Sequence, residues 1–308
     1  MTSFSITIYL LTGTTLLYFG GEFLVKGAKN IARIFGVSPI VVGLTIVAFG
    51  TSLPELVVSL VAAISGKEAI AIGNVIGSNI ANVGLIVGLT CSLFYVAIEG
   101  KDFLRDLNIM IGVSIAFLFI LFDGQVSRTE GFILFLGIVT YTFYTFFSNK
   151  KTTEEIEESG STFQNIGLLI IGMLGLYFGS NLFVEGAINL AKILGITDII
   201  IGMTIVAYGT SLPELATSIV AALKKEGDIS IGNIIGSNLF NMMGVVGPVA
   251  IISPLKAESS IFLFELPIML AFSLALYPII LKSNIISRKY ASILLLGYIS
   301  FIASLFIL

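Results

Sequence analysis

The sequence predicts an all-helical integral membrane protein with ten transmembrane helices, arranged as two inverted-topology repeats of five with helices interrupted at the midplane. Two observations predict the class: 56% of the 308 residues are hydrophobic and only 11% are charged, against roughly 45–50% and 25% in soluble domains. A third observation predicts the symmetry, because a polar stretch of the first half recurs in the second. A soluble two-domain enzyme would need a charged surface, which 16 basic and 19 acidic side chains do not supply.

Long apolar runs separated by charged residues define ten spans. A transmembrane helix needs about 20 apolar residues, and the runs are continuous rather than alternating, which argues against a β-barrel. The expected spans are 5–34, 39–64, 69–94, 104–122, 129–147, 164–193, 198–223, 228–254, 261–281 and 287–307. They form one integrated membrane domain, with a first repeat over 1–147, an acidic linker over 148–163 and a second repeat over 164–308.

The basic residues favour one orientation of these spans. Four of the 16 Lys and Arg fall on the side of the N-terminus, and the other twelve fall on the opposite side. Basic residues are enriched in cytoplasmic loops. We therefore expect a multi-pass protein of the cell membrane, with both termini outside and the acidic linker in the cytoplasm.

The composition also argues against several chemistries. The chain has no histidine, the commonest general base and a common metal ligand. Cys91 is the only cysteine, so no intrachain disulfide can form. The net charge of −3 is too small to indicate a nucleic-acid partner. We expect neither enzymatic activity nor a cofactor, and a monomer without an obligatory protein partner.

The polar repeat is strong and keeps one register. Residues 43–63 and 202–222 are identical at 16 of 21 positions, at an offset of 159 residues. The same offset relates Ser78-Asn79 to Ser237-Asn238. Each half holds five spans, an odd number, so the second half crosses the membrane in the opposite sense. Inverted repeats with interrupted helices are typical of secondary transporters, whose binding site lies at the midplane between the repeats. A gene duplication without functional meaning does not explain why the best-matched segments are polar.

Glu55 and Glu214 lie well inside expected spans and are counterparts in the repeat. A carboxylate in the hydrocarbon region is unfavourable by several kcal/mol unless it is paired or solvated. Since no Lys or Arg lies at comparable depth, a bound cation is the expected counter-charge. The alternative is that both groups are protonated and hydrogen-bonded. Glu265 and its counterpart Asp106 fall near helix starts, so we expect both at the membrane interface.

A proline precedes each of these glutamates and is expected to interrupt its helix. Pro54 and Pro213 lack an N–H group and clash with the carbonyl four residues earlier. This should free backbone carbonyls around Ala48–Thr51 and Ala207–Thr210. The hydroxyl groups three and four residues before each glutamate then lie on the same helical face as its carboxylate. Hydroxyl, carbonyl and carboxylate oxygens favour hard cations such as Ca²⁺ and Na⁺.

The third and eighth spans contain the related segments GNVIGSNIAN and GNIIGSNLFN. Their serine and asparagine side chains stand four residues apart, as Ser78 with Asn82 and Ser237 with Asn241, and so share a helical edge. We expect these edges to ligate cations, with interhelical hydrogen bonding as the alternative. The glycines of both segments form G-x-x-x-G motifs, which are typical of close helix packing in membranes.

The paired GTSLPE and GNxxGSN motifs resemble the Ca²⁺:cation antiporter superfamily, and most closely its Na⁺/Ca²⁺ exchanger family, over essentially the whole chain. The resemblance implies four cation sites near the midplane, and a sliding first and sixth span that switches access between the two sides. It implies that the glutamates and nearby threonine carbonyls hold Ca²⁺ while the other ligands complete Na⁺ sites. The implied metal ligands are Ala48, Thr51, Ser52, Glu55, Ser78, Asn82, Ala207, Thr210, Ser211, Glu214, Ser237 and Asn241.

We therefore expect a secondary active antiporter that exchanges Na⁺ for Ca²⁺ by alternating access, electrogenically and without K⁺. The proton-coupled branch carries an acidic residue that both GNxxGSN segments lack, and a K⁺-dependent branch places Asp where Asn241 stands. The alternatives are an exchanger of Ca²⁺ or another divalent cation for H⁺ on the same scaffold and, in a different class, a cation channel. An intramembrane hydrolase is disfavoured because two glutamates in mirror positions do not form a differentiated acid and base.

Overall fold

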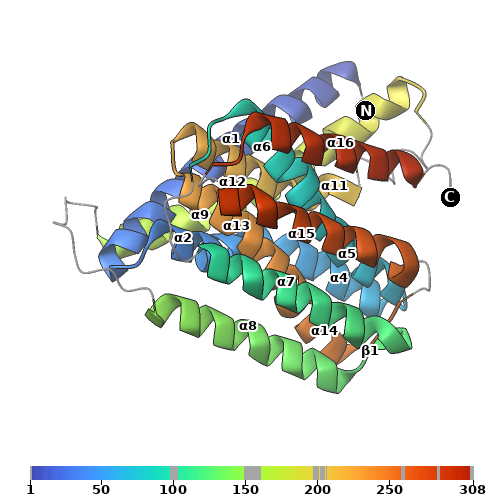
Figure 1. Cartoon of the computed structure of the whole chain (residues 1–308). Helices are drawn as coiled ribbons and strands as arrows, with labels where there is room; N and C mark the ends of the chain where they lie inside the picture. The colour runs from blue at the N-terminus through green and yellow to red at the C-terminus, as the bar shows by residue number, and fades with distance from the viewer. Residues whose placement is uncertain are drawn as a thin grey trace.

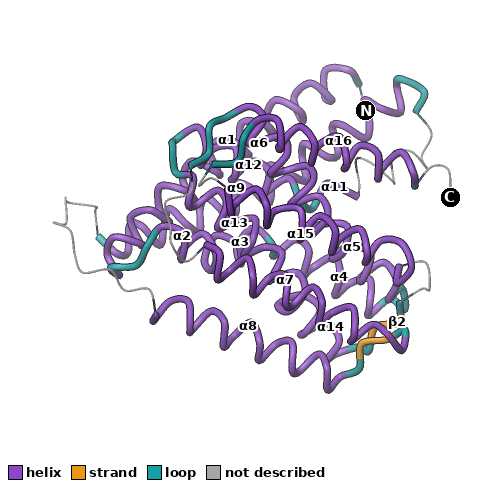
Figure 2. The backbone as a smooth tube through the Cα atoms, viewed as in Figure 1, coloured by secondary structure: helices purple, strands orange, loops and turns teal. Residues whose placement is uncertain are grey.

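The computed structural model describes residues 2–97, 103–148, 161–196, 201, 205, 207–257, 261–282 and 285–305. Within these ranges, helical segments occupy each of the ten expected spans (Figures 1 and 2). Six helices are long and apolar enough to cross a membrane, and the bent pair Pro39–Thr51 and Leu53–Ile64 would make a seventh. The helices Leu212–Leu223 and Ile261–Tyr277 are apolar but shorter. The chain is therefore an all-helical membrane protein.

The first repeat runs from α1 to α8. Its elements are α1 (Ser3–Phe35), α2 (Pro39–Val42), η1 (Gly43–Val47), α3 (Ala48–Thr51), α4 (Leu53–Ile64), α5 (Glu68–Ala81), η2 (Asn82–Val87), α6 (Gly88–Leu93), α7 (Phe103–Ile120), η3 (Leu121–Asp123), β1 (Gln125–Val126) and α8 (Arg128–Ser148). Most of the predicted acidic linker, residues 149–160, lies outside the described part of the chain.

The second repeat runs from α9 to α16. Its described elements are α9 (Thr162–Ile193), α11 (Ala207–Gly209), α12 (Leu212–Leu223), α13 (Gly227–Leu239), η5 (Phe240–Val245), α14 (Val246–Ile252), β2 (Leu255–Lys256), η6 (Ile261–Glu265), α15 (Leu266–Lys282) and α16 (Arg288–Ser304). Most of the chain between α9 and α11, at the start of the predicted span 198–223, is outside the described ranges.

The two longest helices begin with side-chain caps that the sequence supplies. Thr2 caps α1 by accepting a hydrogen bond from the backbone N–H of Ser5 at 3.2 Å. Ser161 and Gln164 form a reciprocal capping box at the start of α9. Helix α1 ends at Gly36, whose φ of 64° is left-handed and therefore favours glycine. These signals fix both ends of α1 and the start of α9, the two helices that pair most extensively.

Helices α1 and α9 pack backbone to backbone through glycines. A Cβ atom added at Gly20 would lie 2.7 Å from the backbone nitrogen of Leu176, and one added at Gly172 would lie 2.6 Å from that of Leu24. Small residues allow this close approach, which is a main source of helix association in membranes. The first and sixth spans therefore form one closely packed pair.

The polar motifs lie in the centre of the bundle. In the most apolar stretch of each helix, 72% of the residues of Glu68–Leu93 and 83% of those of Gly227–Ile252 are buried. In the peripheral helix Arg128–Ser148 the corresponding share is 28%. Figure 1 shows α8 along one outer edge and α13 and α5 inside. The spans that carry GNxxGSN are thus enclosed by the others.

Short backbone pairings link loops of the two repeats. Strands β1 and β2 pair antiparallel, with Gln125 opposite Lys256. A separate bridge joins Ala97 to Ile285. At the repeat offset of 159 residues, Ala97 is the counterpart of Lys256 and Ile285 is the counterpart of Val126. The sequence did not predict these pairings, because two residues are too short for a strand pattern.

The expected close packing of the GxxxG motifs holds for the second copy. A Cβ atom at Gly232 would lie 2.8 Å from the carbonyl oxygen of Ile40, and one at Gly236 would lie 2.5 Å from that of Leu44. For the first copy the expectation stays a prediction, because the repeat counterparts of Ile40 and Leu44 are Ile199 and Met203, which lie outside the described residues. Gly73 and Gly77 border a cavity.

Candidate cation site

Both proline-containing helices are interrupted at the same place. Helix α3 ends at Thr51 and α4 begins at Leu53, and the two segments are bent by 42°. Ser52 between them has φ −84° and ψ 4°, and Ser211, at the matching position, has φ −85° and ψ 3°. The two serines therefore have the same backbone conformation, and each is followed by Leu, Pro and Glu.

The helix breaks leave only some of the nearby backbone carbonyls without a hydrogen bond in the described chain. The carbonyl of Ala48 accepts the N–H of Ser52 at 3.0 Å and the hydroxyl of Thr51 at 3.3 Å, so it is not a free carbonyl as expected. In the second repeat the N–H of Ser211 donates to Tyr208 at 3.1 Å, one residue short of an α-helical bond to Ala207. Of Ala207 only the backbone is described.

The two glutamates are fully buried, each at 0% exposure. Ser78 donates to Oε1 of Glu55 at 3.4 Å, and Ser52 donates to Oε1 of Glu214 at 3.3 Å. Within the described chain neither carboxylate forms an ion pair, and Oε2 of each accepts no hydrogen bond. Two buried carboxylates thus have only weak neutral donors.

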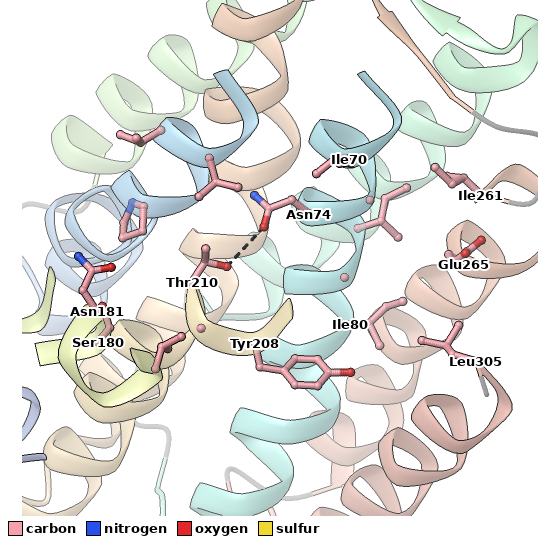
Figure 3. A pocket seen from close by; sticks show the side chains of 18 of the residues that line it. Ile70, Asn74, Ile80, Ser180, Asn181, Tyr208, Thr210, Ile261, Glu265 and Leu305 are labelled. Carbon is pink, nitrogen blue, oxygen red and sulfur yellow. Dashed lines mark hydrogen bonds between the residues drawn. The ribbon is translucent and has the colours of Figure 1, made fainter. Parts of the chain in front are cut away.

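Hydroxyl groups of the broken helices bind asparagines of the opposite repeat. Thr51 donates to Oδ1 of Asn233 at 3.1 Å and lies 3.3 Å from the hydroxyl of Ser237. Its counterpart Thr210 donates to Oδ1 of Asn74 at 3.4 Å (Figure 3). The contacts are reciprocal, as expected for two copies related by an approximate twofold axis.

Four buried asparagines form a second reciprocal set. Asn82 donates to Oδ1 of Asn238 at 3.0 Å, and Asn241 donates to Oδ1 of Asn79 at 3.0 Å. These bonds use the amide nitrogens of Asn82 and Asn241, and their Oδ1 atoms accept no hydrogen bond. Each π-helical segment, η2 and η5, begins at or one residue before one of these asparagines, and such bulges are frequent at functional sites.

Sequence reasoning missed the supporting role of Asn74, Asn79, Asn233 and Asn238. A signal for it was present, because all four lie in the repeated GNxxGSN segments. In isolation each segment offers two asparagines and a serine, and only the packing of the repeats shows which of them orient the others.

Hydrogen bonds thus link many of the predicted ligands across the two repeats, and several of their oxygens lack partners in the described chain. Within the described chain, the buried acceptor oxygens without a partner in this region are Oε2 of Glu55, Oε2 of Glu214, Oδ1 of Asn82 and Oδ1 of Asn241. Buried polar atoms are almost always hydrogen-bonded, so a concentration of orphan acceptors is the donor set expected for hard cations. Among the described residues no group of three His, Cys, Asp or Glu gathers.

Two acidic residues that we expect at the membrane interface lie near helix starts, Asp106 in the first turn of α7 and Glu265 directly before α15. Asp106 is fully buried, bound by Arg105 at 3.0 Å and by the hydroxyl of Tyr141 at 3.3 Å. Glu265 lines a cavity, and its Oε2 is buried without a partner in the described chain. The two counterparts therefore differ, because Arg105 precedes Asp106 whereas phenylalanine precedes Glu265.

Comparison with known proteins agrees with this architecture. The family "Sodium/calcium exchanger protein" matches residues 5–148 and 164–307. The chain is 35% identical to the sodium/calcium exchanger MaX1 of Methanosarcina acetivorans, over 97% of this chain and 98% of the relative. It is 37% identical to the putative antiporter CaxA of Alkalimonas amylolytica, over 96% and 97%. A structure of the sodium-calcium exchanger NCX_Mj, soaked with Na⁺ and without Ca²⁺, superposes with a TM-score of 0.87 at 36% identity, covering 99% of this chain and 100% of that one.

The fold and the site define a multi-pass membrane protein of two repeats that meet at an oxygen-lined centre, which is the architecture of a secondary cation antiporter and not of an enzyme. The chain belongs to the sodium/calcium exchanger family.

Proposed function

We propose that the protein exchanges Na⁺ for Ca²⁺ across the membrane by alternating access, with Glu55 and Glu214 as the shared carboxylate ligands. The observation that carries this proposal is the pair of fully buried carboxylates, each with an Oε2 that accepts no hydrogen bond from the described residues. Buried charge without compensation is strongly unfavourable. A bound cation supplies the compensation, and the surrounding hydroxyl and amide oxygens suit Ca²⁺ and Na⁺.

Competition for these oxygens explains why transport would be an exchange. Two carboxylates balance the charge of one Ca²⁺, and several Na⁺ ions can occupy the same region with the help of neutral ligands. Because both ions need the same glutamates, occupancy by one disfavours the other. Exchange of several Na⁺ for one Ca²⁺ would move net charge, so we propose an electrogenic cycle.

The neutral side chain of Asn241 supports independence from K⁺. The site has two buried carboxylates, and Asn82 and Asn241 add amide oxygens without further charge. One divalent cation therefore neutralises the site without a monovalent companion.

The α1–α9 pair is the element proposed to move. It touches the site-bearing core mainly through α12, where Lys224 pairs with Glu22 of α1 at 2.6 Å and Lys29 of α1 pairs with Glu226. Exposed ion pairs of this kind are weak, because water screens their charges. They can hold α1 at one end and still be broken within a transport cycle.

Relatives support a cation antiporter and leave a second candidate. NCX_Mj has been crystallised with Na⁺ together with Ca²⁺ or Sr²⁺ in the soaking solution. The name of CaxA states only an antiporter. Exchange of Ca²⁺ or another divalent cation for H⁺ is therefore the second candidate function.

We also propose that the protein is a monomer with both termini outside the cell.

Flux measurements with purified protein in proteoliposomes test the proposal. Ca²⁺ uptake is followed under an imposed outward gradient of Na⁺, K⁺ or H⁺, with the membrane voltage clamped. We expect uptake with the Na⁺ gradient alone, and a rate that changes with voltage. Uptake driven by the H⁺ gradient instead would establish the second candidate, and Ca²⁺ flux without a counter-ion would indicate a channel.

A further inference from the structure

A cavity of about 600 Å³ adjoins the candidate cation site. Its wall includes Pro54, Asn74 and Thr210 at one part and Ile261, Glu265 and Leu305 at another (Figure 3). The inner part touches the site directly, because Asn74 donates to the backbone carbonyl of Glu55 at 3.2 Å and accepts from Thr210.

The outer part of the cavity lies on the side of the two termini. In the ten-span arrangement the third and ninth spans begin on that side, and the tenth ends there. These ends contribute Ile70, Ile261, Glu265 and Leu305 to the wall. The cavity therefore extends from this face of the bundle toward the site between the repeats.

Glu265 is the single charged residue among the described residues that line the cavity. Its Oε2 atom is buried and has no hydrogen-bond partner in the described chain. The other polar groups of the wall are neutral hydroxyl and amide groups, such as those of Ser180, Asn181 and Tyr208. An ionised carboxylate in a mostly apolar cavity has a field that water screens poorly, and it attracts a cation.

We propose that Glu265 forms a transient cation-binding station in this cavity, through which Na⁺ and Ca²⁺ pass between the side of the termini and the exchange site. The proposal rests on the proposed exchange function for the identity of the ions. A single carboxylate binds a hard cation more weakly than two, so the station concentrates ions without trapping them. Asp106, its counterpart, cannot do the same because Arg105 already neutralises it.

The first test measures charge in the cavity without transport. In a Cys91→Ala background, Leu305→Cys is modified with methanethiosulfonate reagents that carry either an ammonium or a sulfonate group, and rates are normalised to Ser65→Cys. We expect the cationic reagent to react several-fold faster, and millimolar Ca²⁺ to slow it. Adding Glu265→Gln should remove both effects, whereas Glu265→Asp should keep them.

Glu68→Gln is the matched control, because Glu68 begins α5 on the same side and does not line the cavity. It should leave the preference for the cationic reagent unchanged. Equal rates of the two reagents in the otherwise native protein, or an equal loss of preference in Glu68→Gln and Glu265→Gln, would overturn the proposal.

The second test measures sided transport. Glu265→Gln should raise the KM for Ca²⁺ applied on the side of the termini several-fold, while the KM on the opposite side and the maximal rate stay unchanged. An unchanged KM on the termini side would contradict the station. If the native protein exchanges no Ca²⁺ for Na⁺, the proposed function fails, and the reaction rates at Leu305→Cys still decide whether Glu265 attracts cations.

Discussion

Asn79 and Asn238 show how single residues orient the candidate ligands. Each uses its side-chain oxygen to accept the amide of Asn241 or Asn82. That bond leaves the oxygen of the ligand amide unpartnered, and therefore available to a cation. Partners of this type commonly change metal affinity about 10–100-fold when they are removed.

We predict that Asn79→Ala and Asn238→Ala each raise the apparent KM for Na⁺ and Ca²⁺ by about tenfold. The two variants should resemble each other because the contacts are reciprocal. Loss of one partner of a buried hydrogen bond should also lower stability by about 1–3 kcal/mol. Flux assays and thermal unfolding measure the two effects, with Asn189→Ala as control, since Asn189 bonds only within α9. Lower stability with unchanged KM would show that these asparagines serve packing alone.

The sequence predicted the chemistry of the site better than its geometry. Glu55 and Glu214 stood out because carboxylates inside apolar spans need a counter-charge. The sequence could not show that Ser52 binds Glu214 of the other repeat while Ser78 binds Glu55 of its own. Which repeat supplies each hydroxyl group depends on packing between distant segments, so local spacing carries no information about it.

Helices α1 and α9 contact each other over most of their length, and glycines in the contact leave no room for a larger side chain. Gly172 of α9 faces the backbone of α1 at Leu24. Gly167, five residues earlier on the same helix, has no atom of the described chain within 4 Å of an added Cβ. The two glycines therefore form a matched pair for testing the contact.

We predict that Gly172→Ala destabilises the protein by about 1–3 kcal/mol or more, because the added methyl group meets backbone that cannot move aside. Gly167→Ala should be neutral or stabilising by up to about 1 kcal/mol, since alanine favours helix. The fraction that stays monodisperse in size-exclusion chromatography after heating compares the variants. Equal stability of the two would mean that α1 and α9 are less closely packed than described.

Element positions followed from apolar runs, but fine structure within helices did not. The interruptions before Pro54 and Pro213 were predictable because proline lacks the N–H group. The π-helical segments at Asn82–Val87 and Phe240–Val245 were not, because they contain no residue that is excluded from an α-helix. They depend on how the central helices fit against the opposite repeat.

At the scale of the whole molecule, the inverted repeat fixes the relative sides of all loops. The loop at Ser65, between α4 and α5, should face outside, and the linker at Thr152, outside the described residues, should face the cytoplasm. We predict that Ser65→Cys, in a Cys91→Ala background, reacts with an impermeant thiol reagent added to intact cells. Thr152→Cys should react only after the cells are opened. Reaction of both from the same side would contradict the ten-span arrangement.

The central claim is that one pair of buried carboxylates serves both transported ions. Glu55→Gln and Glu214→Gln keep the shape of each side chain and remove its charge, so the fold should survive. The most direct measurement is Na⁺-driven Ca²⁺ uptake by each variant in proteoliposomes, with Glu68→Gln as the control for loss of an acidic residue elsewhere. We predict that Ca²⁺ uptake by both site variants falls more than 100-fold, beyond the roughly 10–100-fold loss typical of residues that only support ligands. Uptake by the control variant should stay near the native rate. Near-native uptake by either Glu55→Gln or Glu214→Gln would contradict the shared-carboxylate mechanism.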